Sequence, residues 1–131
     1  MKSRRFLANA AVTLLLAGAA CLASARFELL GAAATPAEIV VVEETRDLLT
    51  LPQAQLAMLG SPALRRAMAA SRIAFQRVDK DASGPDVPTW AIYAAKNHPL
   101  PSWVARSKSG RVTVRPCPTN EAEALRAIGG N

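Results

Sequence analysis

The sequence predicts an α/β domain in which helices flank a mixed four-stranded sheet, in the order β-α-β-α-β-β-α. Three observations lead to this prediction. A continuous β-branched run opens the domain, stretches with helical spacing alternate with strands, and a hairpin precedes a final helix. The composition allows such a fold, because 50% of the 131 residues are hydrophobic and the length suffices for one ordinary domain.

The first strand is predicted from Glu38 to Glu43, where Ile39-Val40-Val41-Val42 lies between two charged residues. A β-branched run without polar alternation is typical of a strand that is buried on both faces. Such burial indicates a parallel or mixed sheet with helices on both sides.

A loop over residues 44–49 is predicted to follow this strand. Thr50 is then expected to be the N-cap of a helix, with Gln53 completing a capping box. The Gly-Ser-Pro triplet at 60–62 interrupts the helical spacing and favours a new start, with Ser61 as N-cap. The pattern is equally consistent with one bent helix and with two consecutive helices.

The second strand is predicted over residues 73–79 and a further helix from Pro88 to about Asn97. The helical connection between the first two strands is long enough for a crossover, which predicts that these strands are parallel.

A hairpin is expected to follow, with one strand starting from Pro101 and a return at Ser109-Gly110. The last helix is predicted to begin at Thr119-Asn120-Glu121 and to end at Gly129-Gly130.

The N-terminus has the pattern of an export signal. Residues 1–5 carry three basic side chains, residues 6–25 have no charge, and Ala23-Ser24-Ala25 before Arg26 fits signal-peptidase cleavage. The sequence therefore predicts an exported protein with a periplasmic or other extracytoplasmic domain.

Three fates of the N-terminal segment stay open. It is cleaved between Ala25 and Arg26, it remains as a hydrophobic helix that anchors residues 6–25 in the membrane, or it is lipidated at Cys21. Gly18 departs from the larger aliphatic residue that a bacterial lipobox carries at this place. The predicted organisation is a signal peptide or anchor over 1–25, a linker over 26–37 and the α/β domain over 38–131.

The charge distribution does not indicate nucleic-acid binding. From Arg26 onward the chain has 13 basic and 10 acidic residues, a net charge of +3, and the basic residues are scattered. A nucleic-acid interface would need a dense basic face with stacking aromatic side chains.

The order of elements, with a proline opening the third strand, resembles the thioredoxin-like fold. In that family a cis-proline precedes the third core strand, a short hairpin follows, and a terminal helix packs back. Leu100-Pro101-Ser102-Trp103-Val104 resembles the family's run of apolar, proline, small, apolar and apolar residues. The resemblance covers about residues 38–129. It implies a cis Leu100–Pro101 bond beside a groove that meets extended peptides.

The chain departs from the redox members of this family. Those members carry Cys-x-x-Cys at the start of the first helix, whereas residues 43–52 here contain no cysteine. Thiol–disulfide exchange needs an attacking thiolate and a resolving partner. Dithiol oxidoreductase activity is therefore not expected, and no catalytic residue or cofactor is assigned.

The resulting functional hypothesis is a redox-inactive binding or scaffolding module for a protein or peptide. Its expected surface joins the 44–49 loop to the Leu100-Pro101 turn and includes Asp47. Two alternatives stay open: a single-cysteine thiol enzyme that uses Cys117, and a structural envelope protein tethered by residues 6–25.

Five further features have both a functional and a structural explanation. Cys117 is a possible free thiol, but a small apolar residue packed in a turn is favoured. Asp79–Gly84 imitates the start of an EF-hand loop, yet the twelfth position is Trp90 rather than glutamate, so a turn at a strand end is favoured over calcium. His98 is expected to cap a helix rather than to act in catalysis or bind a metal. The acidic residues Glu43, Glu44 and Asp47 are expected to be a solvated loop, and Trp90 and Trp103 to be core residues.

Overall fold

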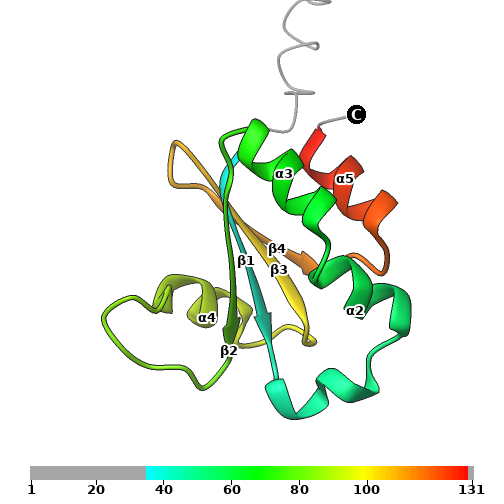
Figure 1. Cartoon of the computed structure of the whole chain (residues 1–131). Coiled ribbons are helices and arrows are strands. Elements are labelled where there is room, and N and C mark those ends of the chain that lie inside the picture. Colours follow the sequence, from blue (N-terminus) through cyan, green and yellow to red (C-terminus); the bar gives the residue numbers. More distant parts are fainter. Residues whose placement is uncertain (1–34, 130–131) are drawn as a thin grey trace, which may run out of the picture. The chain divides into compact units, whose positions relative to one another are not determined.

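The computed structural model describes residues 35–129. Its strands are β1 (Pro36–Glu43), β2 (Ala74–Asp79), β3 (Ser102–Ser107) and β4 (Val112–Pro116). Its helical elements are the 3-10 helix η1 (Thr45–Thr50) and the α-helices α2 (Gln53–Leu59), α3 (Pro62–Ala70), α4 (Thr89–Ala95) and α5 (Glu121–Gly129). The strands form one mixed sheet in the order β2-β1-β3-β4 (Figure 1). The predicted α/β class with a mixed, helix-flanked sheet is confirmed.

Strand β1 is an inner strand of this sheet. It is parallel to β2, with Glu43 opposite Asp79, and antiparallel to β3, with Val42 opposite Ser102. The four residues from Ile39 to Val42 are at most 1% exposed, so the predicted burial on both faces is confirmed.

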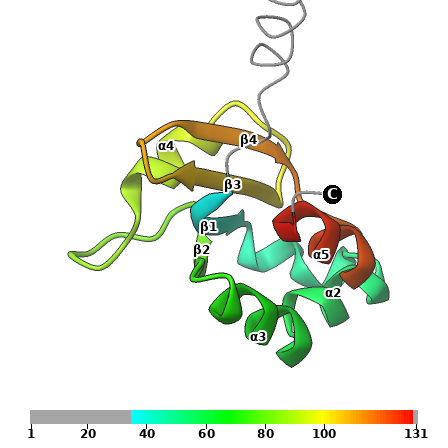
Figure 2. The ribbon, with the colours of Figure 1, turned by 90° about the horizontal axis from the view of Figure 1, so that it is seen from above.

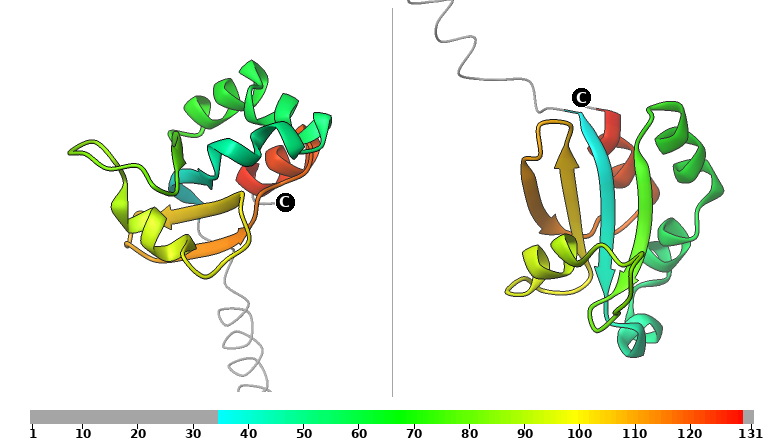
Figure 3. Two further views of the ribbon diagram at one scale, coloured as in Figure 1. Left: turned by 90° about the horizontal axis from the view of Figure 1, so that it is seen from below. Right: turned by 90° about the vertical axis from the view of Figure 1, so that its left-hand side faces the viewer.

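The two faces of the sheet have separate cores. Because successive side chains of a strand point to opposite faces, Ile39 and Val41 pack with α2, α3 and α5, whereas Val40 and Val42 pack with α4. Figure 2 shows α2, α3 and α5 together on one side of the sheet and α4 on the other, and Figure 3 gives the same arrangement from two further directions.

Residues 60–62 separate two consecutive helices, which decides between the two possibilities left by the sequence. The Ser61 hydroxyl oxygen accepts a hydrogen bond of 3.1 Å from the Leu64 amide, as predicted for an N-cap. The same hydroxyl donates to the Glu121 carboxylate and so joins the start of α3 to the start of α5.

The predicted capping box at Thr50 was wrong. Helix α2 begins only at Gln53, and the Thr50 hydroxyl instead donates to the Asp47 carbonyl at 2.7 Å inside η1. The cause is Pro52, because a proline disfavours helical backbone at the residue before it, and Leu51 is extended. Residues 45–50 are consequently a 3-10 helix rather than a loop.

Two element boundaries also differ from the prediction. Strand β1 already starts at Pro36, which pairs with Ser107, so residues 36 and 37 belong to the sheet rather than to the linker. Helix α4 is shorter than expected and ends at Ala95.

The hairpin and the last helix follow the prediction. The Leu100–Pro101 peptide bond is cis, as the resemblance implies, and Gly110 turns the chain with a φ of +87°. Helix α5 starts where the Asn120 side-chain oxygen accepts from the Glu123 amide at 3.0 Å.

The predicted signal peptide or anchor, the Ala25–Arg26 cleavage site and Cys21 lie outside the described residues. Within residues 35–129, no helix combines the length and the apolarity that crossing a membrane requires.

Replacing the Ser61 cap tests the link between α3 and α5. We expect Ser61→Ala to lower the free energy of unfolding by about 1 kcal/mol, because an amide at the start of α3 loses its acceptor. Urea denaturation measures this change, with Ser83→Ala at an exposed loop position as the matched control. Equal stability of the two variants would contradict the assigned cap.

Candidate functional site

The carboxyl end of β1 brings together the residues that the sequence predicted for binding. They line a small cavity of about 20 Å³, here called the Pro101 hollow, formed by Glu43, Glu44, Asp47, Leu48, Leu51, Leu100 and Pro101. A cavity of this size holds about one water molecule. A partner at this place would therefore contact the rim of the hollow rather than insert a side chain.

The sheet register explains why these segments meet. Val42 pairs with Ser102, so the turn before β3 lies beside the end of β1 and the start of η1. The Pro101 carbonyl accepts a hydrogen bond of 3.1 Å from the Cys117 amide, and the Ser102 hydroxyl donates to the Pro99 carbonyl at 2.7 Å. Both bonds hold the turn in place from within the chain.

The acidic residues of the hollow differ in their surroundings. Glu43 is buried and accepts from the Arg77 guanidinium at 3.0 Å, whereas Glu44 pairs with Lys80 at 3.2 Å. Asp47 is exposed, and no ionic partner contacts it among residues 35–129. The predicted solvated acidic loop therefore holds for Asp47 but not for the buried Glu43.

Asp79 organises the turn after β2. Its carboxylate accepts from the amides of Thr45 and Asp81, each at 2.8 Å. Hydrogen bonds from Thr45 and Asp81 lower the pKa of Asp79 to about 2. The carboxylate thus links the start of η1 to the end of β2, which agrees with the predicted turn at a strand end. In the described part of the chain, no three His, Cys, Asp or Glu side chains converge as metal ligands.

Cys117 lies in the core between the sheet and α2, α3 and α5, where it is 5% exposed. The side-chain Nε2 of Gln55 donates hydrogen bonds to the backbone carbonyls of Cys117 and Pro118, at 3.2 and 3.0 Å, and so fixes this segment. Burial raises the pKa of the Cys117 thiol to about 12. The free thiol is consequently protonated at neutral pH and a poor nucleophile.

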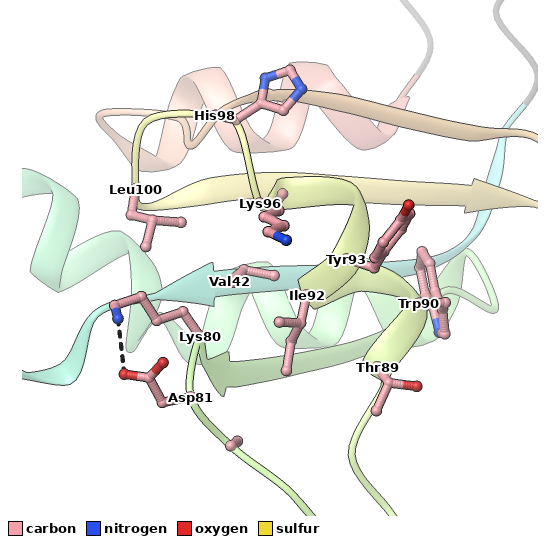
Figure 4. Close-up of a pocket in the computed structure, with 12 residues that line it drawn as sticks. Val42, Lys80, Asp81, Thr89, Trp90, Ile92, Tyr93, Lys96, His98 and Leu100 are labelled. Atoms are coloured by element: carbon pink, nitrogen blue, oxygen red, sulfur yellow. Dashed lines mark hydrogen bonds and ion pairs between the residues drawn. The ribbon is translucent and has the colours of Figure 1, made fainter.

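A second and much larger hollow, which no pattern in the sequence indicated, lies against α4. This α4 groove has a volume of about 820 Å³ (Figure 4). It is lined by Val42, Lys80, Asp81, Ala82, Thr89, Trp90, Ile92, Tyr93, Ala95, Lys96, His98 and Leu100. Leu100 borders both the α4 groove and the Pro101 hollow.

The groove changes the interpretation of two predicted structural residues. The backbone amide of His98 donates to the Ala95 carbonyl at 2.9 Å, so His98 closes the end of α4, but its exposed side chain lines the groove. Trp103 is a core residue as predicted, whereas Trp90 is only half-buried and forms a wall of the groove. In the sequence, Tyr93 and Lys96 follow Trp90 at intervals of three residues, which places them near one another on a helix but does not by itself indicate a groove.

The comparisons add no relative to this description. No protein-family model, curated protein or solved structure matches the chain.

The Glu43–Arg77 pair offers a test of how the floor of the Pro101 hollow is held. We expect Arg77→Leu to lower the free energy of unfolding by about 2 kcal/mol, because it leaves a buried carboxylate without its cation. The cost stays below that of a fully buried pair because the Arg77 side chain is 29% exposed. Adding Glu43→Gln should restore part of the loss in a double-mutant cycle. Arg111→Leu, at an exposed position, is the control, and an equal loss in that variant would contradict the assignment.

Thiol labelling tests the inertness of Cys117. In a Cys21→Ser variant, where Cys117 is the only cysteine, we expect a thiol probe at pH 8 to react at least about a hundredfold more slowly than in the urea-unfolded chain. The reason is that burial keeps the native thiol protonated and covered. Comparable rates in the two states would contradict both the burial and the raised pKa.

Proposed function

We propose that the chain is an exported, redox-inactive, thioredoxin-like module that binds or scaffolds a protein or peptide partner at the rim of the Pro101 hollow. The thioredoxin-like assignment is supported by the order of strands and helices and by the cis-proline before β3. Export is supported by the N-terminal sequence pattern alone.

The observation that carries the proposal is the meeting of η1 with the Leu100-Pro101 turn at one end of the sheet. This is the surface where the resemblance implies contact with extended peptides. An extended segment laid beside such a turn gains affinity from main-chain hydrogen bonds and specificity from neighbouring side chains.

The side chains of η1 provide an anchor and a charge for such a segment. Leu49 is 92% exposed, and the exposed Asp47 precedes it by two residues in the same short helix. An exposed apolar residue near a carboxylate that has no ionic partner among residues 35–129 favours a partner that offers an apolar side chain and a basic one.

The two alternatives have less support. A thiol enzyme that uses Cys117 would need an accessible thiolate, and the thiol is buried with a raised pKa. A tethered structural protein depends on residues 6–25, and a measured N-terminus at Arg26 would exclude it.

Photo-crosslinking in the native host tests the proposal. A benzophenone amino acid at Leu49 should give a discrete adduct, because this side chain would contact the partner. The same group at Val112, an exposed apolar residue at the opposite end of the sheet, should not. Asp47→Lys should reduce the Leu49 adduct about fivefold or more by reversing the charge beside the anchor, whereas Lys108→Glu should leave it unchanged. Identical adducts from positions 49 and 112, or an adduct insensitive to Asp47→Lys, would overturn the proposal.

A further inference from the structure

The α4 groove has the size and lining of a small-molecule site. Its volume of about 820 Å³ falls within the range of about 300–1,000 Å³ that is typical of ligand pockets. Its lining includes the buried Val42 and Ala95, together with Ile92 and Leu100. An apolar body placed in the groove would therefore be removed from water on its inner side.

An arginine of the sheet packs against the aromatic residue Trp90, which forms one wall of the groove. The guanidinium carbon of Arg106 in β3 lies 4.2 Å from the centroid of the Trp90 ring, and Arg106 is itself paired with Glu38 in β1. Tyr93, which is 80% exposed, also lines the groove. The groove thus presents a fixed indole and an uncovered phenol ring.

The charges of the groove leave one cation without a partner. The Lys80 ammonium pairs with Glu44 at 3.2 Å and with Asp81 at 2.8 Å, so its charge is compensated. Lys96 has no ionic partner among residues 35–129. In Figure 4 the Lys96 ammonium is seen between Leu100 and Tyr93, whereas Lys80 points toward Asp81. The exposed Lys96 is thus a lining residue of the same groove as the apolar Ile92 and Leu100.

We propose that the α4 groove binds a small amphipathic carboxylate. The apolar body of the ligand lies on Val42, Ile92 and Leu100, and its carboxylate pairs with the Lys96 ammonium. Asp81 and Glu44 are already engaged by Lys80, so they do not cancel the positive charge of Lys96. A neutral amphiphile would gain only the apolar contacts, and a cationic one would also be repelled.

Site-resolved NMR tests this proposal with octanoate as the probe. In the full-length protein with ¹⁵N-labelled tryptophan, octanoate below its micelle concentration should shift the Trp90 indole resonance in a saturable manner. The resonance of Trp103, which is 1% exposed, should stay in place and report an intact fold. Reading the Trp90 signal separates binding in the groove from any binding to the hydrophobic N-terminal residues.

Matched probes and variants separate the contribution of the carboxylate charge to octanoate binding from that of the apolar contacts. Compared with octanoate, 1-octanol should bind about three- to fivefold more weakly, and octyltrimethylammonium more weakly still. Lys96→Gln should weaken octanoate about three- to fivefold, whereas Lys108→Gln, which removes the same charge from the β3–β4 turn, should have no effect. Ile92→Ala should weaken octanoate about threefold through lost apolar contact, whereas Val112→Ala, at an exposed apolar position outside the groove, should have no effect.

Three outcomes would overturn the assignment. The first is equal binding of octanoate and octyltrimethylammonium, and the second is equal affinity in the Lys96→Gln and Lys108→Gln variants. The third is tighter binding of an acetylated Ala-Leu dipeptide with a free carboxylate, which would assign the groove to the C-terminus of a peptide instead. None of these outcomes bears on the crosslinks from Leu49, so this site and the proposed function can fail separately.

Discussion

The arrangement of this protein depends on covering both faces of one strand. The side chains from Ile39 to Val42 are β-branched and almost completely buried, and they point alternately to the two sides of the sheet. One layer of helices cannot shield them. The chain therefore places α2, α3 and α5 on one face and α4 on the other (Figure 2).

Both candidate sites reach the carboxyl end of β1, where Val42 lines the α4 groove and Glu43 lines the Pro101 hollow. Glu43 is buried, and its carboxylate is paired with the Arg77 guanidinium. Glu44 is less buried and pairs with the Lys80 ammonium. Lys80 and Leu100 then separate the two sites. Lys80 pairs with Glu44 beside the Pro101 hollow and with Asp81 beside the α4 groove, and Leu100 lines both. The Pro101 hollow and the α4 groove thus have Leu100 in common and are linked by the ion pairs of Lys80.

Local signals made much of the fold predictable, and long-range contacts account for what was missed. The β-branched run identified β1, and Ser61 and Gly110 identified a cap and a turn, because each acts on neighbouring backbone. The Thr50 cap failed because Pro52 imposes a stronger local restriction. The α4 groove could not be predicted, since its lining combines residues of β1, the turn after β2, α4 and the segment before β3. Helical spacing placed Trp90 in the core but could not show that Arg106 from β3 covers it.

Cys117 supports the Pro101 turn through its backbone and not through its thiol. The Cys117 amide donates to the Pro101 carbonyl, while the thiol points into the apolar core with Trp103 and Ala124. The last strand and its following segment therefore fix the turn through backbone rather than through sulfur chemistry. A turn fixed in this way loses little conformational entropy when a partner binds. The thiol takes no part in this hydrogen bond, so the support of the turn comes from the Cys117 backbone alone.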